Sequence, residues 1–260
     1  MAGPLNGRTG IISTAKETAS LGSALITGAA VRIGAAISRR LHRDGYDVIL
    51  HYNRSSGSAE SLAGELNRSR PGSAHAVQTD LGEPNAAADL LNESIKLRSD
   101  LRLIVNNAAI FVPSSLADSA IQAWDELFHI NTKIPYQLAL EAASTLAVNR
   151  GAVVNIADIH IHHPRPNYAI YDASKTALAS LTRSLALELA PDVRANAVAP
   201  GAIMWADDEP EDAKQSIIEA IPLARIGDPD DIAEAVSYLA RAEYVTGQIL
   251  KVDGGRSLAV

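Results

Sequence analysis

The chain has no cysteine among its 260 residues, and it has only two phenylalanines, two tryptophans and two methionines. Without cysteine there is no disulfide, no thiolate nucleophile and no zinc site with sulfur ligands. We therefore expect a reducing compartment and a cytoplasmic protein. No run of about 18 apolar residues is present, and the N-terminal segment lacks the apolar stretch of a secretory signal. We predict that residues 1–20 form a flexible tail.

The chain also lacks an excess of positive charge, because its formal net charge is −7. Bulk attraction to nucleic acid or to an anionic membrane is therefore not expected. What is present is apolar: 47% of the residues are hydrophobic, enough to bury a substantial core. No linker and no internal repeat interrupts the chain, so residues 21–260 are predicted to form one domain.

Short apolar runs alternate with segments of helical periodicity. "SALITG" at residues 23–28 predicts a strand, and the helix-like stretch after it closes at Gly45. Further strands are predicted at "YDVILHY", "SAHAVQTDL", "LRLIVNNA", "GAVVNIAD", "VRANAVAPG" and "GQILKVDGG". Strands that are short and apolar on both faces are typical of a buried parallel sheet. We predict a single Rossmann-type doubly wound α/β domain, with about seven parallel strands and helices on both faces.

The stretch "TGAAVRIG" at residues 27–34 connects the first predicted strand to the first predicted helix. In a doubly wound sheet this turn presents backbone N–H groups and a helix N-terminus to a pyrophosphate. Gly28 and Gly34 suit such a turn, although glycines at this spacing also mark ordinary tight turns. Arg32 stands where a third glycine is expected and adds a guanidinium beside the phosphate groups.

The second predicted strand ends in "LHYNRSS", without the acidic residue that normally binds the adenosine ribose of NAD. His51, Asn53, Arg54, Ser55 and Ser56 offer hydrogen-bond donors instead. An arginine at this point forms a charge-assisted pair with a 2′-phosphate. The alternative for Arg54 is a solvated loop arginine. The missing acid favours NADP(H) over NAD(H).

Tyr171 and Lys175 in "YDASK" are four residues apart at the start of a helical pattern, so their side chains share a helix face. A lysine ammonium beside a phenol stabilises the phenolate and is expected to lower the pKa of the tyrosine. The alternative is an ordinary surface pair.

Together these features resemble the short-chain dehydrogenase/reductase family. The resemblance covers residues 23–256 and rests on "TGAAVRIG", "TDL", "NNAA", "HINTKIPY", "YDASK", "APG" and "VTGQILKVDGG", which follow one another in the family's order. It implies that Tyr171 is the catalytic acid, that Lys175 lowers its pKa and binds the nicotinamide ribose, and that Asn131 holds a proton-relay water. It also implies a homotetramer. The implied cofactor contacts are Gly28, Arg32, Ile33, Gly34, His51, Tyr52, Asn53, Arg54, Ser55, Asp80, Leu81, Asn107, Ala108, Ala109, Tyr171, Lys175, Pro200, Gly201 and Ile203.

One position departs from the family. The family's usual serine, which polarises a substrate carbonyl, is replaced by Asp158. An ionised aspartate offers only acceptors and repels a developing oxyanion. A protonated carboxyl, or one that relays a proton through water, suits a ring nitrogen that gains a proton as hydride reaches the adjacent carbon. Asp158 therefore indicates reduction of a C=N bond.

Asp158, Arg32 and the stretches "LHYNRSS" and "NNAAIF" together resemble the pteridine reductase branch. That resemblance implies that Arg32 reaches pterin and cofactor phosphate, and that Phe111 stacks on the pterin. The alternative for Phe111 is a core phenylalanine. Ala109 lacks the hydroxyl of some members of the branch. The acidic segment at residues 204–214 is predicted to be a loop over the site. The implied substrate contacts are Arg32, Phe111, Asp158, Tyr171, Met204 and Trp205.

Three functions are compatible with these motifs. The favoured one is NADPH-dependent reduction of dihydropterin to tetrahydropterin, with oxidised pterin and dihydrofolate as further substrates. A carbonyl reductase acting on a 3-oxoacyl or similar ketone is the nearer alternative, and a non-catalytic NADP(H)-binding regulator is the more distant one. His160, His162 and His163 in "IHIHHPRPNY" are close together, but their spacing favours a substrate-side loop over a metal site.

Overall fold

A seven-stranded parallel sheet forms the centre of the computed structural model, which describes residues 20–114, 123–205 and 210–259. Its strand order is β3-β2-β1-β4-β5-β6-β7. The strands are β1 Ser23–Ile26, β2 Asp47–Tyr52, β3 Ala74–Gln78, β4 Leu101–Asn106, β5 Ala152–Ile156, β6 Arg194–Pro200 and β7 Ile249–Val252. The α-helices are α1 Arg32–Asp44, α2 Ser56–Ser69, α3 Ala86–Leu97, α4 Trp124–Phe128, α5 Ile134–Glu141, α6 Ala143–Val148, α7 Ala169–Glu188, α8 Glu211–Glu219 and α9 Pro229–Arg241.

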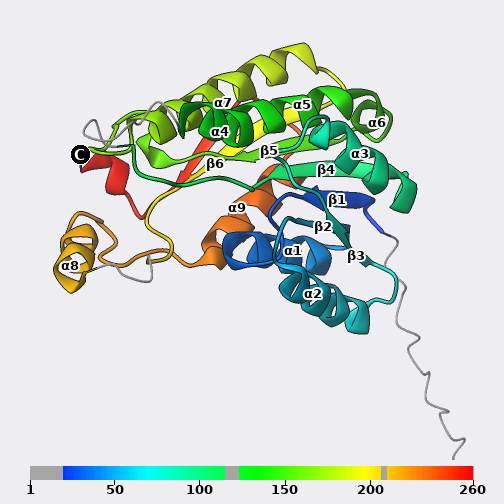
Figure 1. The fold of residues 1–260 in the computed structure, drawn as a ribbon, viewed down its shortest axis with the longest axis horizontal. Helices are drawn as coiled ribbons and strands as arrows, with labels where there is room; N and C mark the ends of the chain where they lie inside the picture. The colour runs from blue at the N-terminus through cyan, green and yellow to red at the C-terminus, as the bar shows by residue number, and fades with distance from the viewer. Residues whose placement is uncertain (1–19, 115–122, 206–209, 260) are drawn as a thin grey trace, which may run out of the picture.

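Helices cover both faces of the sheet (Figure 1). Helices α1, α2 and α9 lie on one face, and α3 to α7 lie on the other, while α8 stands apart at one end. Alternate residues of a strand point to opposite faces, as β1 illustrates: Ala24 and Ile26 belong to the core layer under α1 and α9, and Leu25 belongs to the layer under α3 and α5. The sheet is therefore buried on both faces, which is why its strands are apolar throughout.

The predicted fold class, the seven strands and the closure of the first helix at Gly45 are confirmed. Gly45 has a left-handed φ of 107°, a conformation in which glycine ends helices at little cost. Helix α7 begins at Ala169 and carries both Tyr171 and Lys175, as predicted. One predicted boundary was wrong, because the loop predicted for residues 204–214 gives way to α8 at Glu211. The predicted tail lies outside the described residues apart from Ser20.

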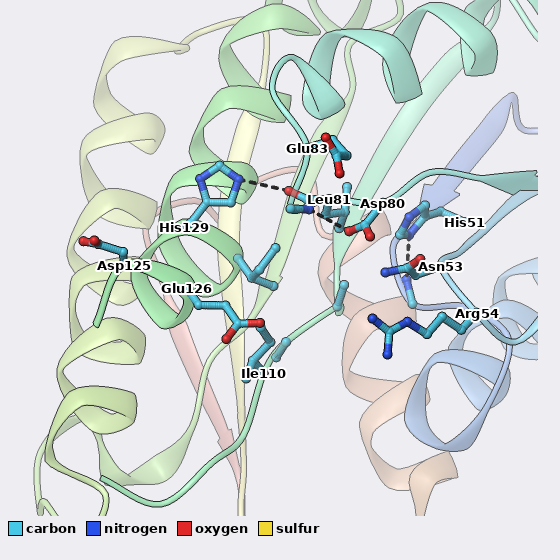
Figure 2. A pocket seen from close by; sticks show the side chains of 15 residues that line it. His51, Asn53, Arg54, Asp80, Leu81, Glu83, Ile110, Asp125, Glu126 and His129 are labelled. Carbon is cyan, nitrogen blue, oxygen red and sulfur yellow. Dashed lines mark hydrogen bonds between the residues drawn. The ribbon is translucent and has the colours of Figure 1, made fainter. Parts of the chain in front are cut away.

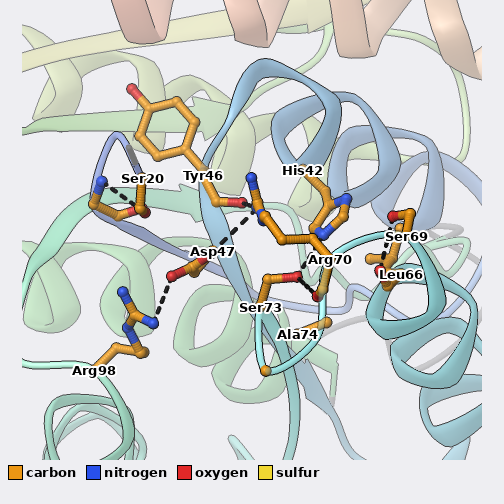
Figure 3. A network of polar contacts seen from close by, with 12 residues as sticks. Ser20, His42, Tyr46, Asp47, Leu66, Ser69, Arg70, Ser73, Ala74 and Arg98 are labelled. Atoms are coloured by element: carbon orange, nitrogen blue, oxygen red, sulfur yellow. Dashed lines mark hydrogen bonds and ion pairs between the residues drawn. The ribbon is translucent and has the colours of Figure 1, made fainter. Parts of the chain in front are cut away.

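An ion-pair network fixes the amino ends of three strands (Figure 3). Asp47, the first residue of β2, is buried and pairs with Arg70, which precedes β3, and with Arg98, which precedes β4. Arg70 also donates to the carbonyl of Tyr46. A buried carboxylate needs such partners. This network lies at the opposite end of the strands from the cavity described next. Among the described residues, no helix is long and apolar enough to cross a membrane.

Candidate active site

A cavity of about 660 Å³ opens beyond the carboxyl ends of β1, β2, β3 and β4 (Figure 2). This is the place where doubly wound sheets bind ligands, because the chain leaves β1 and β4 toward opposite faces. Eight residues predicted to contact the cofactor line it: Gly28, His51, Asn53, Arg54, Asp80, Leu81, Ala108 and Ala109. The rest of the lining was not among the predicted contacts, although three of its members lie within the motifs "NNAAIF" and "HINTKIPY": Gly82, Glu83, Ile110, Asp125, Glu126, His129 and Ile130.

The glycine turn is held tightly against β4. Asn107 donates from its side-chain amide to the carbonyls of Thr27, at 2.9 Å, and of Gly28, at 3.0 Å. Thr27 Oγ1 in turn accepts from the backbone N–H groups of Asn107 and Ala108, both at 3.0 Å. A Cβ at Gly34 would lie 2.1 Å from the carbonyl oxygen of Gly28, so the turn requires glycine there. These contacts hold the backbone of the turn in one conformation.

His51 also holds the glycine turn in place. Its buried ring accepts a hydrogen bond at Nδ1 from the backbone N–H of Gly28, at 3.1 Å, and Nε2 donates to the carbonyl of Thr79, at 3.0 Å. This pattern requires the neutral ring with its proton on Nε2. Burial lowers the pKa of His51, and its hydrogen bond to Thr79 opposes that shift. Both ring nitrogens are engaged within the protein, and His51 also lines the cavity, so its contact with the cofactor stays a prediction.

The two arginines predicted to meet phosphate are both exposed. Arg54 lines the cavity one residue beyond Asn53, and Arg32 begins α1. Arg32 has a left-handed φ of 52°, which costs a residue other than glycine about 1 to 3 kcal/mol. Strain of this kind is found mainly at functional sites. It marks Arg32 as a position where a guanidinium is retained at a cost in stability.

Tyr171 and Lys175 are both buried, at 6% and 3% exposure, so the surface-pair alternative is excluded. Both lie on α7. The Tyr171 hydroxyl donates to Asp158 Oδ2 at 3.1 Å, and Lys175 Nζ donates to the carbonyl of Ile156, the last residue of β5, at 2.8 Å. Asp158 follows β5, so the strand and the helix together place the three predicted catalytic side chains side by side.

The expected lowering of the Tyr171 pKa was wrong. Burial raises the pKa of Tyr171 well above its usual value, the negative charge of Asp158 raises it further, and the positive charge of Arg165 opposes them. Lys175 Nζ lies 6.0 Å from the centre of the tyrosine ring, whereas Asp158 is in direct contact with the hydroxyl. Burial lowers the pKa of Lys175 to about 8, against the opposite effect of Asp158.

Asn131 lies in a π-helical turn, His129–Lys133, inside a longer helical segment. Such turns are rare and occur mostly at functional sites. The buried side chain accepts from the backbone N–H of Ile110 at 2.8 Å and donates to the Ile110 carbonyl at 3.0 Å and to Ser174 Oγ at 3.1 Å. Ile110 lines the cavity and Ser174 belongs to α7, so Asn131 ties the cavity wall to the helix that bears Tyr171.

Phe111 is 53% exposed, which excludes the core alternative. Its ring stacks on Tyr168 at a centroid distance of 4.8 Å and meets the Tyr171 ring edge-on, also at 4.8 Å. The guanidinium of Arg165 lies over all three rings. Sequence reasoning missed Arg165, Tyr168 and Asp172. The signal available was their position within seven residues of Tyr171, in the segment between Asp158 and α7.

The remaining predicted contacts differ in their burial and hydrogen bonds. Gly201 is fixed by a hydrogen bond from its N–H to the carbonyl of Val252 at 2.9 Å, and Pro200 and Ile203 are buried on either side of it. Met204 is 41% exposed and Trp205 is half-buried, while residues 206–209 lie outside the described residues. Ile33 and Tyr52 are half-buried and Ser55 is exposed beside the turn. His160 Nδ1 lies 2.9 Å from the carbonyl oxygen of His163, in the predicted histidine loop.

Comparison with known proteins agrees with this geometry. A family model described as Enoyl-(acyl carrier protein) reductase matches residues 28–257. Pteridine reductase 1 of Leishmania tarentolae is 36% identical over 90% of this chain and 96% of its own length. A 3-oxoacyl-[acyl-carrier-protein] reductase of Staphylococcus aureus is 33% identical over 90% of this chain and 97% of its own length. A short-chain type dehydrogenase/reductase of Picea abies is 32% identical over 90% of this chain and 91% of its own length. The chain therefore belongs to the short-chain dehydrogenase/reductase family of oxidoreductases.

Proposed function

We propose that this protein is an NADPH-dependent pteridine reductase that converts dihydropterin to tetrahydropterin, with oxidised pterin and dihydrofolate as further substrates. The observation that carries the proposal is the contact between Asp158 and Tyr171, because it places a carboxylate where a ketone reductase needs a hydrogen-bond donor. Similarity to a pteridine reductase over 90% of the chain supports it.

The residues around the cavity fit a dinucleotide with a 2′-phosphate. The turn from Gly28 to Gly34 lines the cavity through Gly28, and the close approach of Gly34 to the Gly28 carbonyl fixes its shape, while Arg54 supplies a cation at the end of β2. We assign the pyrophosphate to the turn with Arg32, the 2′-phosphate to Arg54, and the nicotinamide end to Lys175 and Gly201. When bound, NADPH supplies the hydride.

The chain's own residues hold the proton. Asp158 accepts from the backbone N–H of His160 at 2.9 Å, from Tyr171 at 3.1 Å and from Arg165 at 3.4 Å. Three donors directed at one carboxyl group are the pattern of the ionised form. This pattern favours a relay over a protonated Asp158 as the acid. The transferable proton is on the Tyr171 hydroxyl, and Asp158 accepts the hydrogen bond that holds this hydroxyl in place. A substrate ring nitrogen that replaces Asp158 as the acceptor of the Tyr171 hydroxyl would receive that proton.

Phe111 contributes an aromatic face beside the proton donor. Half of its surface is exposed, and its edge-on contact with Tyr171 fixes the ring next to the reacting group. A flat heterocycle gains from stacking on such a face. Phe111 and Tyr171 would thus orient a pterin ring, with Met204 and Trp205 as further contacts from the segment before α8.

A carbonyl reductase is the second candidate, because the Staphylococcus aureus relative is a 3-oxoacyl-[acyl-carrier-protein] reductase of similar identity. Asp158 argues against it, since a carboxylate opposes the negative charge that develops on a ketone oxygen. A non-catalytic regulator is less favoured, because Asn131, Tyr171 and Lys175 are all present, and Asn131 joins Ile110 of the cavity wall to the helix that bears the other two. We further propose a homotetramer, which light scattering of the purified protein tests.

Asp158 variants decide between the two enzymes. Asp158→Asn keeps the shape of the side chain but removes its charge, so dihydropterin turnover should fall by roughly 10² to 10⁴ while NADPH binding is retained. Asp158→Ser restores the family's usual hydroxyl, so it should be equally poor on dihydropterin and should gain weak activity on an acetoacetyl thioester. The assay compares both substrates at one pH and one NADPH concentration. The proposal fails if the unmodified protein prefers the thioester, or if Asp158→Asn reduces dihydropterin at the unmodified rate.

A further inference from the structure

Arg165 is clamped by Asp172 across the segment that leads into α7. Its backbone N–H donates to Asp172 Oδ2 at 2.9 Å, and its Nη2 donates to Oδ1 at 2.9 Å. The Asp172 side chain is only 2% exposed, so this carboxylate is removed from water and depends on the guanidinium. The two contacts fix both ends of the arginine, its backbone and its head group.

Three aromatic rings surround the guanidinium. Its central carbon lies 4.8 Å from the ring centre of Tyr168, 5.2 Å from that of Phe111 and 5.3 Å from that of Tyr171. Cations within about 6 Å of aromatic ring centres are attracted to them, more strongly where water is excluded. Arg165 Nε is buried and has no hydrogen-bond partner among the residues that the structure describes. The aromatic rings and the hydrogen bonds to Asp172 together confine the guanidinium.

The same guanidinium reaches the proton-transfer pair. Nη2 lies 3.4 Å from Asp158 Oδ2, the oxygen that accepts from the Tyr171 hydroxyl. Five charged groups act around Tyr171. Asp158 follows β5, Arg165 precedes α7, Asp172 and Lys175 belong to α7, and Arg256 in the C-terminal turn is close enough to act on Asp158 and Arg165. Of these, only Arg165 contacts Asp158 and Asp172 together.

We propose that Arg165, anchored by Asp172, is a positioning residue that holds the Asp158 carboxylate where it accepts the hydrogen bond of Tyr171. Without Arg165, Asp172 loses its ion-pair partner and Asp158 loses a hydrogen-bond donor. The Asp158 carboxylate then no longer holds the Tyr171 hydroxyl in a fixed orientation. The inference rests on the proposed function only in using Asp158 and Tyr171 as the proton-transfer pair. It does not depend on whether the substrate is a pterin or a ketone.

Three variants distinguish the effect of the Arg165 charge from the effect of its fixed position. Arg165→Met removes the charge at similar length, Arg165→Lys keeps the charge without the planar head group, and Asp172→Asn weakens the anchor. Arg39→Met is the matched control, because Arg39 pairs with Glu65 on the surface, where the two side chains are 46% and 43% exposed. Each protein is assayed for kcat and KM between pH 5 and pH 12 with saturating NADPH, with brief exposure above pH 10, and for NADPH binding by fluorescence titration.

Arg165→Met should lower kcat by about 10- to 100-fold, the effect of misplacing a reacting group, and should leave NADPH affinity unchanged. The alkaline limb of its pH profile should move to higher pH, because the positive charge of Arg165 lowers the pKa of Tyr171. Arg165→Lys should move the alkaline limb back to the pH of the unmodified protein and should recover part of kcat. Asp172→Asn should also lower kcat, but its alkaline limb should move to lower pH, because the charge of Asp172 raises the Tyr171 pKa.

All variants are measured with dihydrobiopterin and with an acetoacetyl thioester. Preference of the unmodified protein for the thioester would reject the pterin assignment alone, and the Arg165 comparison would then be made on the thioester. The positioning role is rejected if Arg165→Met retains kcat within about twofold, or if its alkaline limb does not move. It is also rejected if the Met and Lys variants are indistinguishable. If Arg165→Met does not fold, unmodified kcat in both Arg165→Lys and Asp172→Asn rejects it.

Discussion

Replacing Gly34 with alanine tests whether the glycine turn is the cofactor cradle. The added Cβ would lie 2.1 Å from the carbonyl oxygen of Gly28 and 2.8 Å from the side-chain nitrogen of Asn107. Neither neighbour can retreat easily. The Gly28 oxygen belongs to the backbone of the turn, and the Asn107 amide is held by hydrogen bonds of 2.9 Å and 3.0 Å to that same backbone.

The substitution must therefore displace the turn. Overpacking of this kind costs about 1 to 3 kcal/mol of unfolding free energy, and the contact with a fixed backbone oxygen places Gly34→Ala toward the upper end. The displaced turn no longer presents its N–H groups to a pyrophosphate, so NADPH affinity should fall by at least about tenfold, equivalent to 1.4 kcal/mol.

Gly64→Ala is the matched control. Gly64 lies in the middle of α2, and a Cβ there would meet nothing within 4 Å. Alanine is favoured over glycine in a helix interior, so this variant should gain about 0.5 to 1 kcal/mol and bind NADPH normally. Urea unfolding and fluorescence titration of NADPH measure both quantities. The reasoning is refuted if Gly34→Ala matches the unmodified protein in stability and in NADPH affinity.

Arg54→Ala should weaken NADPH binding by about 1.5 to 3 kcal/mol while leaving NADH binding nearly unchanged; equal affinities of the unmodified protein for the two cofactors would contradict the 2′-phosphate assignment. Tyr171→Phe should abolish most turnover yet bind NADPH normally in the same titration, and full activity would remove Tyr171 as the proton donor. Because burial lowers the pKa of His51 below its ordinary 6.5, the unfolded chain takes up a proton first as the solution is acidified. At pH values below about 6.5, His51 should therefore lower the unfolding free energy by up to about 1.4 kcal/mol for each pH unit. His51→Gln should show a smaller change in unfolding free energy between pH 7 and pH 5, measured by urea unfolding.

The strands were predictable because a sheet buried on both faces requires continuous apolar runs. β5, for example, is buried at every position, and its sequence "AVVNI" contains only one polar residue. The start of α8 was missed because Pro210 and the acidic residues after it were interpreted as loop composition. The same residues also favour a helix start, since proline is tolerated at a helix N-terminus and carboxylates stabilise the first turn.

The proximity of the candidate catalytic side chains was predictable, but their electrostatics were not. The spacing of Tyr171 and Lys175 shows that they share a helix face, yet it does not show how much water each side chain loses on folding. Burial dominates both pKa shifts, and Asp158, thirteen positions away in the chain, is the charge in contact with Tyr171. The role of Arg165 was hidden for the same reason, because it arises from a loop that brings Asp158 and Asp172 to one guanidinium.

The place of β1 in the sheet has a consequence for how the chain folds during synthesis. β1 lies between β2 and β4, and α1 packs beside α9, to which it is linked by a 2.6 Å hydrogen bond from Ser237 to Asp44, 193 positions apart. Contacts this distant in sequence slow folding, because the intervening chain must be made and ordered first. The part of the apolar face of α1 that α9 covers therefore stays exposed until most of the polypeptide has left the ribosome. A chain terminated before α9 should aggregate instead of folding as a smaller cofactor-binding unit.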